Sequence, residues 1–209
     1  SLKTMTPQTF LDDVLAQLNL KHLIIGDDFR FGAERAGDFQ LLKNWGKSNG
    51  TQVIANKTVS RDGLRISSTR IREALLQSKF ELAAQLLGRP YTFSGKVVYG
   101  KQLGRTIGVP TANLWIPKQR LPIAGVYAVK CSLAGESFNG IANMGIRPTV
   151  DGSKPVLEIH IFNFSESIYG QRLTVEFKNK LRDEKKFDNI DLLKEQILQD
   201  ISQAKEILE

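Results

Sequence analysis

Hydrophobic positions follow two different periods along this chain, and the change falls near residue 90. In the first 88 residues, apolar side chains recur at helical spacing on either side of two short apolar runs. We expect helices at 6–18, 39–49, 67–76 and 80–87, and buried parallel strands at 22–25 and 53–55. Strands that alternate with helices predict an α/β layer.

From Tyr91 onward the apolar residues alternate with polar ones, as they do along half-buried strands. This period-two pattern covers residues 127–133, 157–162 and 173–177. Several short strands separated by Gly and Pro turns predict an antiparallel barrel or sandwich. A single helix over 190–208 then carries its apolar residues near one face. The turn Gly88-Arg89-Pro90 divides the chain into predicted domains 1–88 and 89–209.

The first of these domains offers only two clear strands. A two-stranded parallel sheet is too small to stand alone with both of its faces covered. We therefore expect the chain to begin inside a larger domain.

Composition narrows the class of protein. Hydrophobic residues make up 41% and charged residues 24%, an ordinary globular balance. The sequence contains neither an apolar run long enough for a membrane span nor an opening secretory leader, so we expect no membrane association. The single cysteine, Cys131, excludes an internal disulfide, fits a reducing cytoplasmic compartment and, with only two histidines, argues against structural zinc.

The net charge of +7 is concentrated in the middle of the chain. Residues 89–187 contain 15 basic and 7 acidic side chains, without a polybasic block. This excess favours an anionic ligand and argues against a nucleic-acid-binding tail. Nucleotide phosphate and nucleic-acid phosphate both remain open on this evidence.

The segment 100–113 is the richest candidate for phosphate chemistry. Gly100, Gly104 and Gly108 would let backbone amides approach phosphate oxygens, and Lys101 and Arg105 would neutralise charge. Beyond them, Thr111 and Asn113 supply neutral oxygen ligands of the kind that Mg²⁺ accepts beside phosphates. The glycine spacing alone would equally suit a hairpin loop on a barrel.

Three further candidates each have a structural alternative. Glu158 lies opposite Leu157 and Ile159 on its strand, so it could act as a general base or simply face solvent. The start of the helix expected at 67–76 could bind triphosphate, or it could simply be a capped, basic helix start. Its residues are Ser68, Thr69, Arg70 and Arg72. Arg182 could form only a surface ion pair. Cys131 and His160 are interpreted as structural residues.

Residues 89–209 resemble riboflavin kinases. The glycine-rich loop and the signature Pro110-Thr111-Ala112-Asn113 carry the resemblance. Supporting motifs follow in the family's order: Gly125-Val126-Tyr127-Ala128, Asn143-Met144-Gly145-x-Arg147-Pro148-Thr149, Glu158-Ile159-His160-Ile161 and Leu181-Arg182-x-Glu184-x-x-Phe187.

This resemblance implies a Greek-key barrel that transfers the γ-phosphate of ATP to riboflavin with Mg²⁺, giving FMN and ADP. It implies that Glu158 is the catalytic base and that Arg182 lies near the flavin. It assigns the metal to Thr111 and Asn113. It assigns ATP and phosphate binding to Gly100, Lys101, Gly104, Arg105, Gly108, Pro110 and Thr111.

A second resemblance rests on two segments of the N-terminal part, Gly26-Asp27-Asp28-Phe29-Arg30-Phe31-Gly32 and Ile66-Ser67-Ser68-Thr69-Arg70-Ile71-Arg72. These segments are similar to the back half of the FMN adenylyltransferase domain of bacterial FAD synthetases, which is Rossmann-like. The resemblance assigns nucleotide binding to Ser68, Thr69, Arg70 and Arg72. The family's H-x-G-H segment does not occur in this sequence, so we expect FMN but not FAD from these residues alone.

A different class of function also fits a small barrel. Such barrels can be non-catalytic modules that bind nucleic acid or a flavin. An evident ladder of exposed aromatics for base stacking is missing from the sequence, which favours small-molecule substrates over nucleic acid. The sequence gives no information on oligomeric state.

Overall fold

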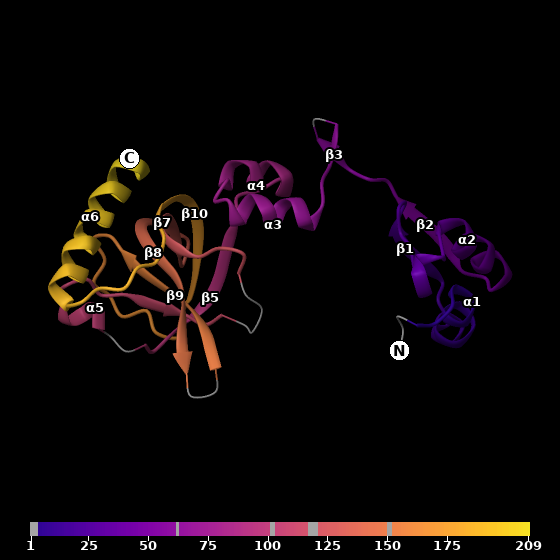
Figure 1. Ribbon diagram of the computed structural model, residues 1–209, viewed down its shortest axis with the longest axis horizontal. Coiled ribbons are helices and arrows are strands. Elements are labelled where there is room, and N and C mark those ends of the chain that lie inside the picture. Colours follow the sequence, from indigo (N-terminus) through magenta and orange to yellow (C-terminus); the bar gives the residue numbers. More distant parts are fainter. Residues whose placement is uncertain (1–3, 62, 101–102, 117–120, 150–151) are drawn as a thin grey trace. The chain divides into compact units, whose positions relative to one another are not determined.

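The computed structural model describes residues 4–61, 63–100, 103–116, 121–149 and 152–209 (Figure 1). Its contacts form two compact units, Ser1–Ile66 and Ser67–Glu209. Among the described residues, no helix combines the length and the apolar character that crossing a bilayer would require.

The N-terminal unit is a small α/β layer. Strands β1 and β2 pair in parallel, with Leu23 opposite Val53, and a short hairpin of β3 and β4 follows. The elements are α1 (Pro7–Phe10), π- and 3₁₀-helical turns (Leu11–Leu15 and Ala16–Leu18), β1 (His22–Gly26), a 3₁₀ turn (Ala33–Arg35), α2 (Phe39–Ser48), β2 (Gln52–Asn56), β3 (Ser60–Arg61) and β4 (Leu64–Arg65). The predicted helix at 6–18 is therefore helical throughout but changes type, and Thr6 caps it as expected.

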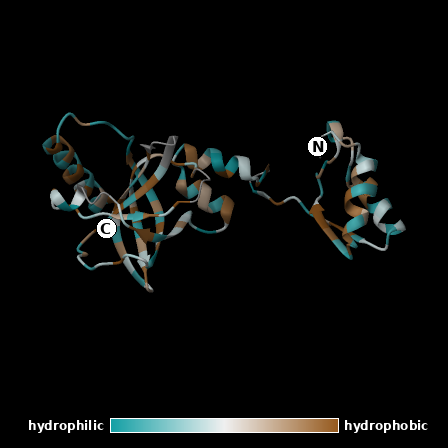
Figure 2. Cartoon of the chain, turned by 90° about the horizontal axis from the view of Figure 1, so that it is seen from below, coloured by the Kyte–Doolittle hydropathy of each residue, from teal (hydrophilic) through white to brown (hydrophobic). Residues whose placement is uncertain are grey.

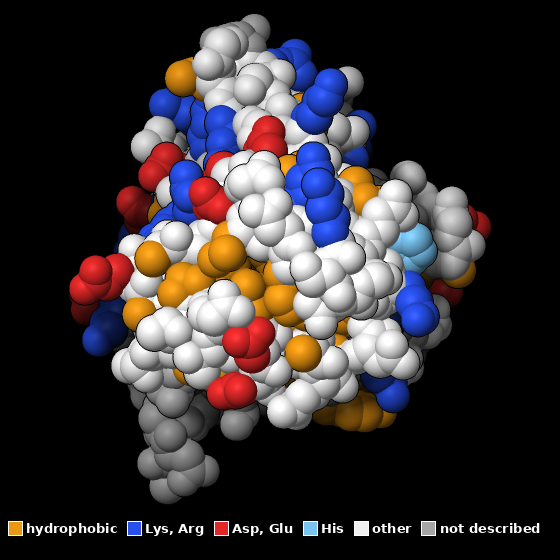
Figure 3. Space-filling model, turned by 90° about the vertical axis from the view of Figure 1, so that its right-hand side faces the viewer, with side chains coloured by type: hydrophobic (Ala, Val, Ile, Leu, Met, Phe, Trp, Pro, Cys, Tyr) orange, Lys and Arg blue, Asp and Glu red, His pale blue; other side chains and the backbone are white. Residues whose placement is uncertain are grey.

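Within the described part of this unit, one face of the two-stranded sheet is packed and the other is exposed. A cluster built on Leu42 and Trp45 of α2 packs against Leu23 and Val53. On the strands' other side, Ile24 remains 60% exposed. In Figure 2 the strands of this unit are mostly apolar, while its helices carry both kinds of residue. Figure 3 shows a face of the molecule where apolar side chains gather among charged ones.

The second unit is built on a closed six-stranded barrel, with strand order β10-β5-β6-β9-β8-β7. Consecutive hairpins join β7, β8 and β9, and β10 returns beside β7, which is the Greek-key arrangement. The predicted antiparallel barrel is confirmed. Its strands are β5 (Thr92–Val98), β6 (Ala112–Leu114), β7 (Gly125–Leu133), β8 (Glu136–Thr149), β9 (Gly152–Ile161) and β10 (Arg172–Arg182).

Alternate side chains of these strands fill the barrel. Leu157 and Ile159 of β9 are both fully buried, as are Leu173 and Val175 of β10. Cys131 belongs to the same core, and its burial raises the pKa of the thiol to about 12. The thiol is therefore a small apolar core group rather than a nucleophile, as the sequence predicted.

Two helices that precede the barrel in sequence belong to its core. They are α3 (Ser68–Leu76) and α4 (Phe80–Leu87), and Phe80 of α4 packs against Tyr127 and Phe177 at ring-centroid distances of 5.7 and 6.0 Å. The compact unit thus begins at Ser67, while the division at 88 and 89 remains a prediction about family domains. Gly88 ends α4 in the left-handed conformation, with a φ of 72°.

A long helix, α6 (Ile190–Leu208), covers part of the barrel's outer surface (Figure 1). Asn189 caps it by accepting a hydrogen bond from the amide of Leu192 at 2.9 Å. Ala204 and Leu208 pack against Ala128 and the residues around it on the outer side of β7. The amphipathic helix predicted over 190–208 is confirmed.

Replacing Phe80 with Ala should destabilise the barrel by about 3–5 kcal/mol, because the change leaves a cavity among core aromatics. Hydrogen exchange of peptides from β7 and β10 would measure this loss. Phe31→Ala, a matched change in the N-terminal unit, should leave exchange in those barrel peptides unchanged. Equal barrel exchange in both variants would contradict the assignment of α4 to the barrel core.

Candidate functional site

Glu158 is held on the outer face of the barrel by the burial of its neighbours. Because Leu157 and Ile159 fill the interior, the side chain between them must point outward. In the strand register, Asn113 of β6 and Asn143 of β8 lie directly opposite Glu158 on its two sides. Residues in register share one face of a sheet, so three polar side chains form a row across β6, β9 and β8.

Glu158 and Asn143 open into a cavity of about 380 Å³ between the barrel wall and α6. The cavity is amphipathic, because apolar residues of β7, β8 and α6 face the polar side chains of β8 and β9. Its other lining residues are Gly104, Ile107, Val109, Thr111, Val126, Ile141, His160, Arg182, Glu184, Lys185, Phe187, Ile190, Leu193, Ile197 and Asp200. Glu158, Gly104, Thr111 and Arg182 were predicted from the sequence, and the fold brings them together here.

The glycine-rich segment folds into a short helix, α5 (Leu103–Thr106), and a tight turn. The amide of Val109 donates to the carbonyl of Gly104 at 2.8 Å, and a Cβ on Gly104 would lie 2.2 Å from the Val109 carbonyl oxygen. Gly108 has a φ of +81°. Close packing therefore demands glycine at position 104, and the left-handed backbone favours it at position 108, whatever ligand the loop binds.

The glycine at position 100 makes room for the amide of Asn113, which lies within 2.3 to 2.7 Å of where a Cβ would stand. Asn113 is 7% exposed. Thr111 and Asn113 are alternate residues of an extended segment, so both face the side of the barrel that carries Glu158. Their oxygens suit Mg²⁺ beside phosphates. Lys101, predicted to bind phosphate, lies outside the described residues.

A second, smaller cavity of about 80 Å³ adjoins the same segment. Arg105, Pro110 and Thr111 line it, together with the loop 164–169. Thr111 is therefore part of the wall of both cavities, while Val97 and Ile159, which belong to the barrel core, line the smaller one alone.

His160, which the sequence analysis interpreted as structural, also lines the larger cavity. Its Nδ1 lies 2.8 Å from the carbonyl oxygen of Pro110, which can only accept, so Nδ1–H is the donor. Burial lowers the pKa of the imidazole. His160 thus ties the Pro110-Thr111 segment to β9 as a neutral ring, and its position two residues after Glu158 is the signal that could have marked it.

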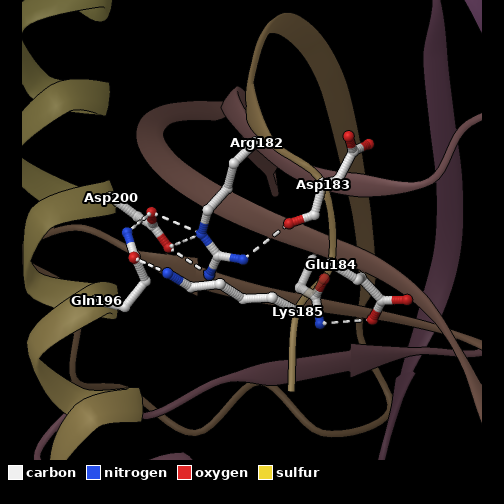
Figure 4. Close-up of polar contacts among 7 residues, drawn as sticks. Arg182, Asp183, Glu184, Lys185, Gln196 and Asp200 are labelled. Atoms are coloured by element: carbon white, nitrogen blue, oxygen red, sulfur yellow. Dashed lines mark hydrogen bonds and ion pairs between the residues drawn. The ribbon is translucent and has the colours of Figure 1, made fainter. Parts of the chain in front are cut away.

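Arg182 joins the end of β10 to α6 (Figure 4). Its Nε donates to one carboxylate oxygen of Asp200 at 2.9 Å and its Nη2 to the other at 2.7 Å. Nη1 donates to the carbonyl of Asp183 at 3.0 Å, and Gln196 donates to Asp200 at 2.9 Å. All three nitrogens of the guanidinium are therefore used within the chain, so the structural role of Arg182 is to fix α6 over the cavity.

Asn143 and Glu184 are two further polar residues of the cavity that the sequence analysis did not single out. Asn143 Nδ2 donates to Glu184 Oε1 at 3.5 Å. Glu184 packs so closely on Gly145 that a Cβ there would overlap its carboxylate. The motif beginning at Asn143 was the available signal, but only the strand register reveals that Asn143 faces Glu158.

The predicted nucleotide-binding residues at 68–72 lie at the start of α3 and do not line this cavity. Ser67, rather than Ser68, caps the helix by accepting from the amide of Arg70 at 3.3 Å. The assignment of these residues to a separate nucleotide-binding site remains a prediction.

Replacing Asp200 with Ala should destabilise the barrel unit by about 3–5 kcal/mol, because it leaves the Arg182 guanidinium without its buried partner. Asp183→Ala is the matched control: its side chain is 87% exposed, so losing its pair with Lys180 should cost about 0–1 kcal/mol. Denaturant unfolding followed by hydrogen exchange of α6 would measure both. Similar losses in the two variants would contradict the clamp.

Comparison with known proteins identifies the relatives of this chain. A family model described as riboflavin kinase matches residues 87–208, and one described as FAD synthetase matches residues 1–70. A bifunctional riboflavin kinase/FMN adenylyltransferase from Haemophilus influenzae is 50% identical over 94% of this chain and 64% of its own length. A protein of the same description from Pseudomonas fluorescens is 44% identical over 98% of this chain and 66% of its own length.

A crystal structure described as a macrolide-efflux protein from Streptococcus pneumoniae superposes with a TM-score of 0.71 at 34% identity. The superposition covers 97% of this chain and 66% of that protein. This chain thus spans about two thirds of the length of its relatives. The family matches cover both units, and the identities extend over nearly the whole chain. We conclude that the chain belongs to the family of bifunctional riboflavin kinase/FMN adenylyltransferases.

Proposed function

We propose that this chain is a riboflavin kinase, which transfers the γ-phosphate of ATP to the 5′-hydroxyl of the ribityl chain of riboflavin. The observation that carries the proposal is the place of Glu158 on the wall of an amphipathic cavity that shares the wall residue Thr111 with a second cavity. Phosphoryl transfer needs an alcohol beside a base and a nucleotide in line with it, and the two cavities offer a place for each substrate on either side of Thr111.

Riboflavin occupies the larger cavity in this proposal. The apolar residues of β7, β8 and α6 accommodate a flat aromatic ring system, and the polar wall formed by β8 and β9 receives the ribityl chain. Arg182 holds α6 in place through its bonds to Asp200 and Asp183. Because Nη1 and Nη2 each carry two N–H groups, the same side chain can also donate to the flavin from the cavity wall.

The phosphates of ATP lie beside the turn of the glycine-rich segment. Gly104 and Gly108 keep the backbone of this turn free of side chains, and Arg105 and Thr111 border the smaller cavity. Gly100, Lys101 and Pro110 complete the predicted phosphate-binding set. Thr111 and Asn113 would hold Mg²⁺, which when bound neutralises charge on the transferred phosphate.

Glu158 acts as the general base. Its carboxylate accepts the proton of the 5′-hydroxyl while that oxygen forms a bond to the γ-phosphorus. The bond from the γ-phosphorus to the bridging oxygen breaks at the same time, and the products are FMN and ADP. His160 keeps the Pro110-Thr111 segment beside this carboxylate through its hydrogen bond to Pro110.

Replacing Glu158 with Gln should lower kcat for FMN formation by about 10²–10⁴-fold, because the amide cannot accept the proton. The KM for Mg-ATP should change little. FMN formation from riboflavin and Mg-ATP, followed by chromatography, is the measurement. Glu136→Gln, at the first residue of β8 and outside the cavity, is the matched control and should retain full activity.

Two outcomes would remove the proposal. The absence of FMN formation by the folded wild-type protein would refute the kinase activity, and tight, salt-sensitive binding of single-stranded RNA would then favour a binding module. A Glu158→Gln variant within about twofold of wild type would remove Glu158 from the base role.

We further propose that the whole protein also adenylylates FMN to FAD, and that Ser68, Thr69, Arg70 and Arg72 contribute to that site. FMN adenylylation brings two anions together, which demands donors or positive charge from several elements. The H-x-G-H segment of this family is absent from residues 1–209. Incubation of these residues with FMN and Mg-ATP should therefore yield no FAD, and clear FAD formation would show that the site lies elsewhere.

A further inference from the structure

One polar atom in the proposed riboflavin site is left without a partner. Asn143 Oδ1 is buried and, within the part of the chain that the structure describes, accepts no hydrogen bond. A buried acceptor without a donor is costly, so native structures leave few of them unsatisfied. This oxygen is also sealed from water, which makes a donor from a bound ligand its natural partner.

The orientation of this amide is fixed by its neighbour. A carboxylate can only accept, so the NH₂ group of Asn143 must face Glu184, as it does at 3.5 Å. The carbonyl oxygen Oδ1 is therefore turned away from Glu184. Glu184 is itself held against Gly145, where no other residue would leave room for its carboxylate.

The strand register sets the distance from Asn143 to the proposed base. Asn143 and Glu158 are directly opposed on β8 and β9, so their Cβ atoms lie about 5 Å apart on one face. Two side chains at that separation can each reach one of two hydroxyls on adjacent carbons of a polyol. The group that Glu158 deprotonates in the proposed function is the terminal hydroxyl.

We propose that Asn143 is a specificity residue whose Oδ1 accepts a hydrogen bond from the hydroxyl next to the one that reacts, the 4′-hydroxyl of the ribityl chain. This inference rests on the proposed kinase function. The bound chain takes the place of the side chains that cover Oδ1. A site built to hydrogen-bond a hydroxyl discriminates strongly against an analogue that lacks it, because the buried acceptor is then left unpaired.

The test compares riboflavin with 4′-deoxyriboflavin in the wild type and in Asn143→Ala. The wild type should prefer riboflavin by about 10–100-fold in kcat/KM. Asn143→Ala should lose this preference within about twofold, because it should lower kcat/KM for riboflavin and leave the value for the deoxy analogue almost unchanged. Activity on the analogue thus reports that the variant is folded. Asn139→Ala, on the same strand but outside the cavity, is the matched control and should keep the full preference.

The outcomes separate the two proposals. If the wild type forms no FMN, the kinase function fails. If it forms FMN but handles both flavins equally, or if Asn143→Ala keeps the wild-type preference, the kinase function stands and the role of Asn143 is overturned. Equal activity of the wild type on both flavins would overturn the role of Asn143 even if Asn143→Ala does not fold.

Discussion

The closure of the six-stranded barrel is the constraint on which the site depends. A closed barrel has one interior, and strands with period two place every second side chain inside it. Once Leu157 and Ile159 fill that interior, Glu158 must face outward. The row Asn113, Glu158 and Asn143 then follows from the pairing of β6, β9 and β8. A shift of one residue in either pairing would turn one strand's contribution away from the cavity.

The outer face of the barrel becomes a cavity only because α6 lies over it. Packing at Ala204 and Leu208 fixes the C-terminal end of α6. The buried ion pair of Asp200 and Arg182 fixes the middle of the helix. With α6 held in this way, Phe187, Ile190 and Leu193 line the same cavity as Glu158. An ion pair of this kind fixes orientation well, because the planar guanidinium engages both carboxylate oxygens.

The sequence predicted what depends on local periodicity and motif. It gave the barrel, the terminal helix, the outward face of Glu158 and the burial of Cys131 correctly, because each follows from alternation within one segment. It could not give the row across three strands, since register depends on hairpin lengths and on packing between distant segments. Asn143 therefore passed unnoticed although its motif was recognised. The role of Arg182 also needed the fold, because its partner Asp200 is 18 residues away on another element.

The packing of α4 on the barrel has a consequence for dividing this protein into exchangeable modules. Family matches divide the chain between residues 70 and 87, yet Phe80 is part of the barrel core. A recombinant fragment that began at residue 89 would uncover Tyr127 and Phe177, which Phe80 otherwise covers. Because α3 and α4 follow one another directly, the helix start at Ser68 belongs to the barrel unit. A graft of the barrel onto another protein would therefore have to include these two leading helices.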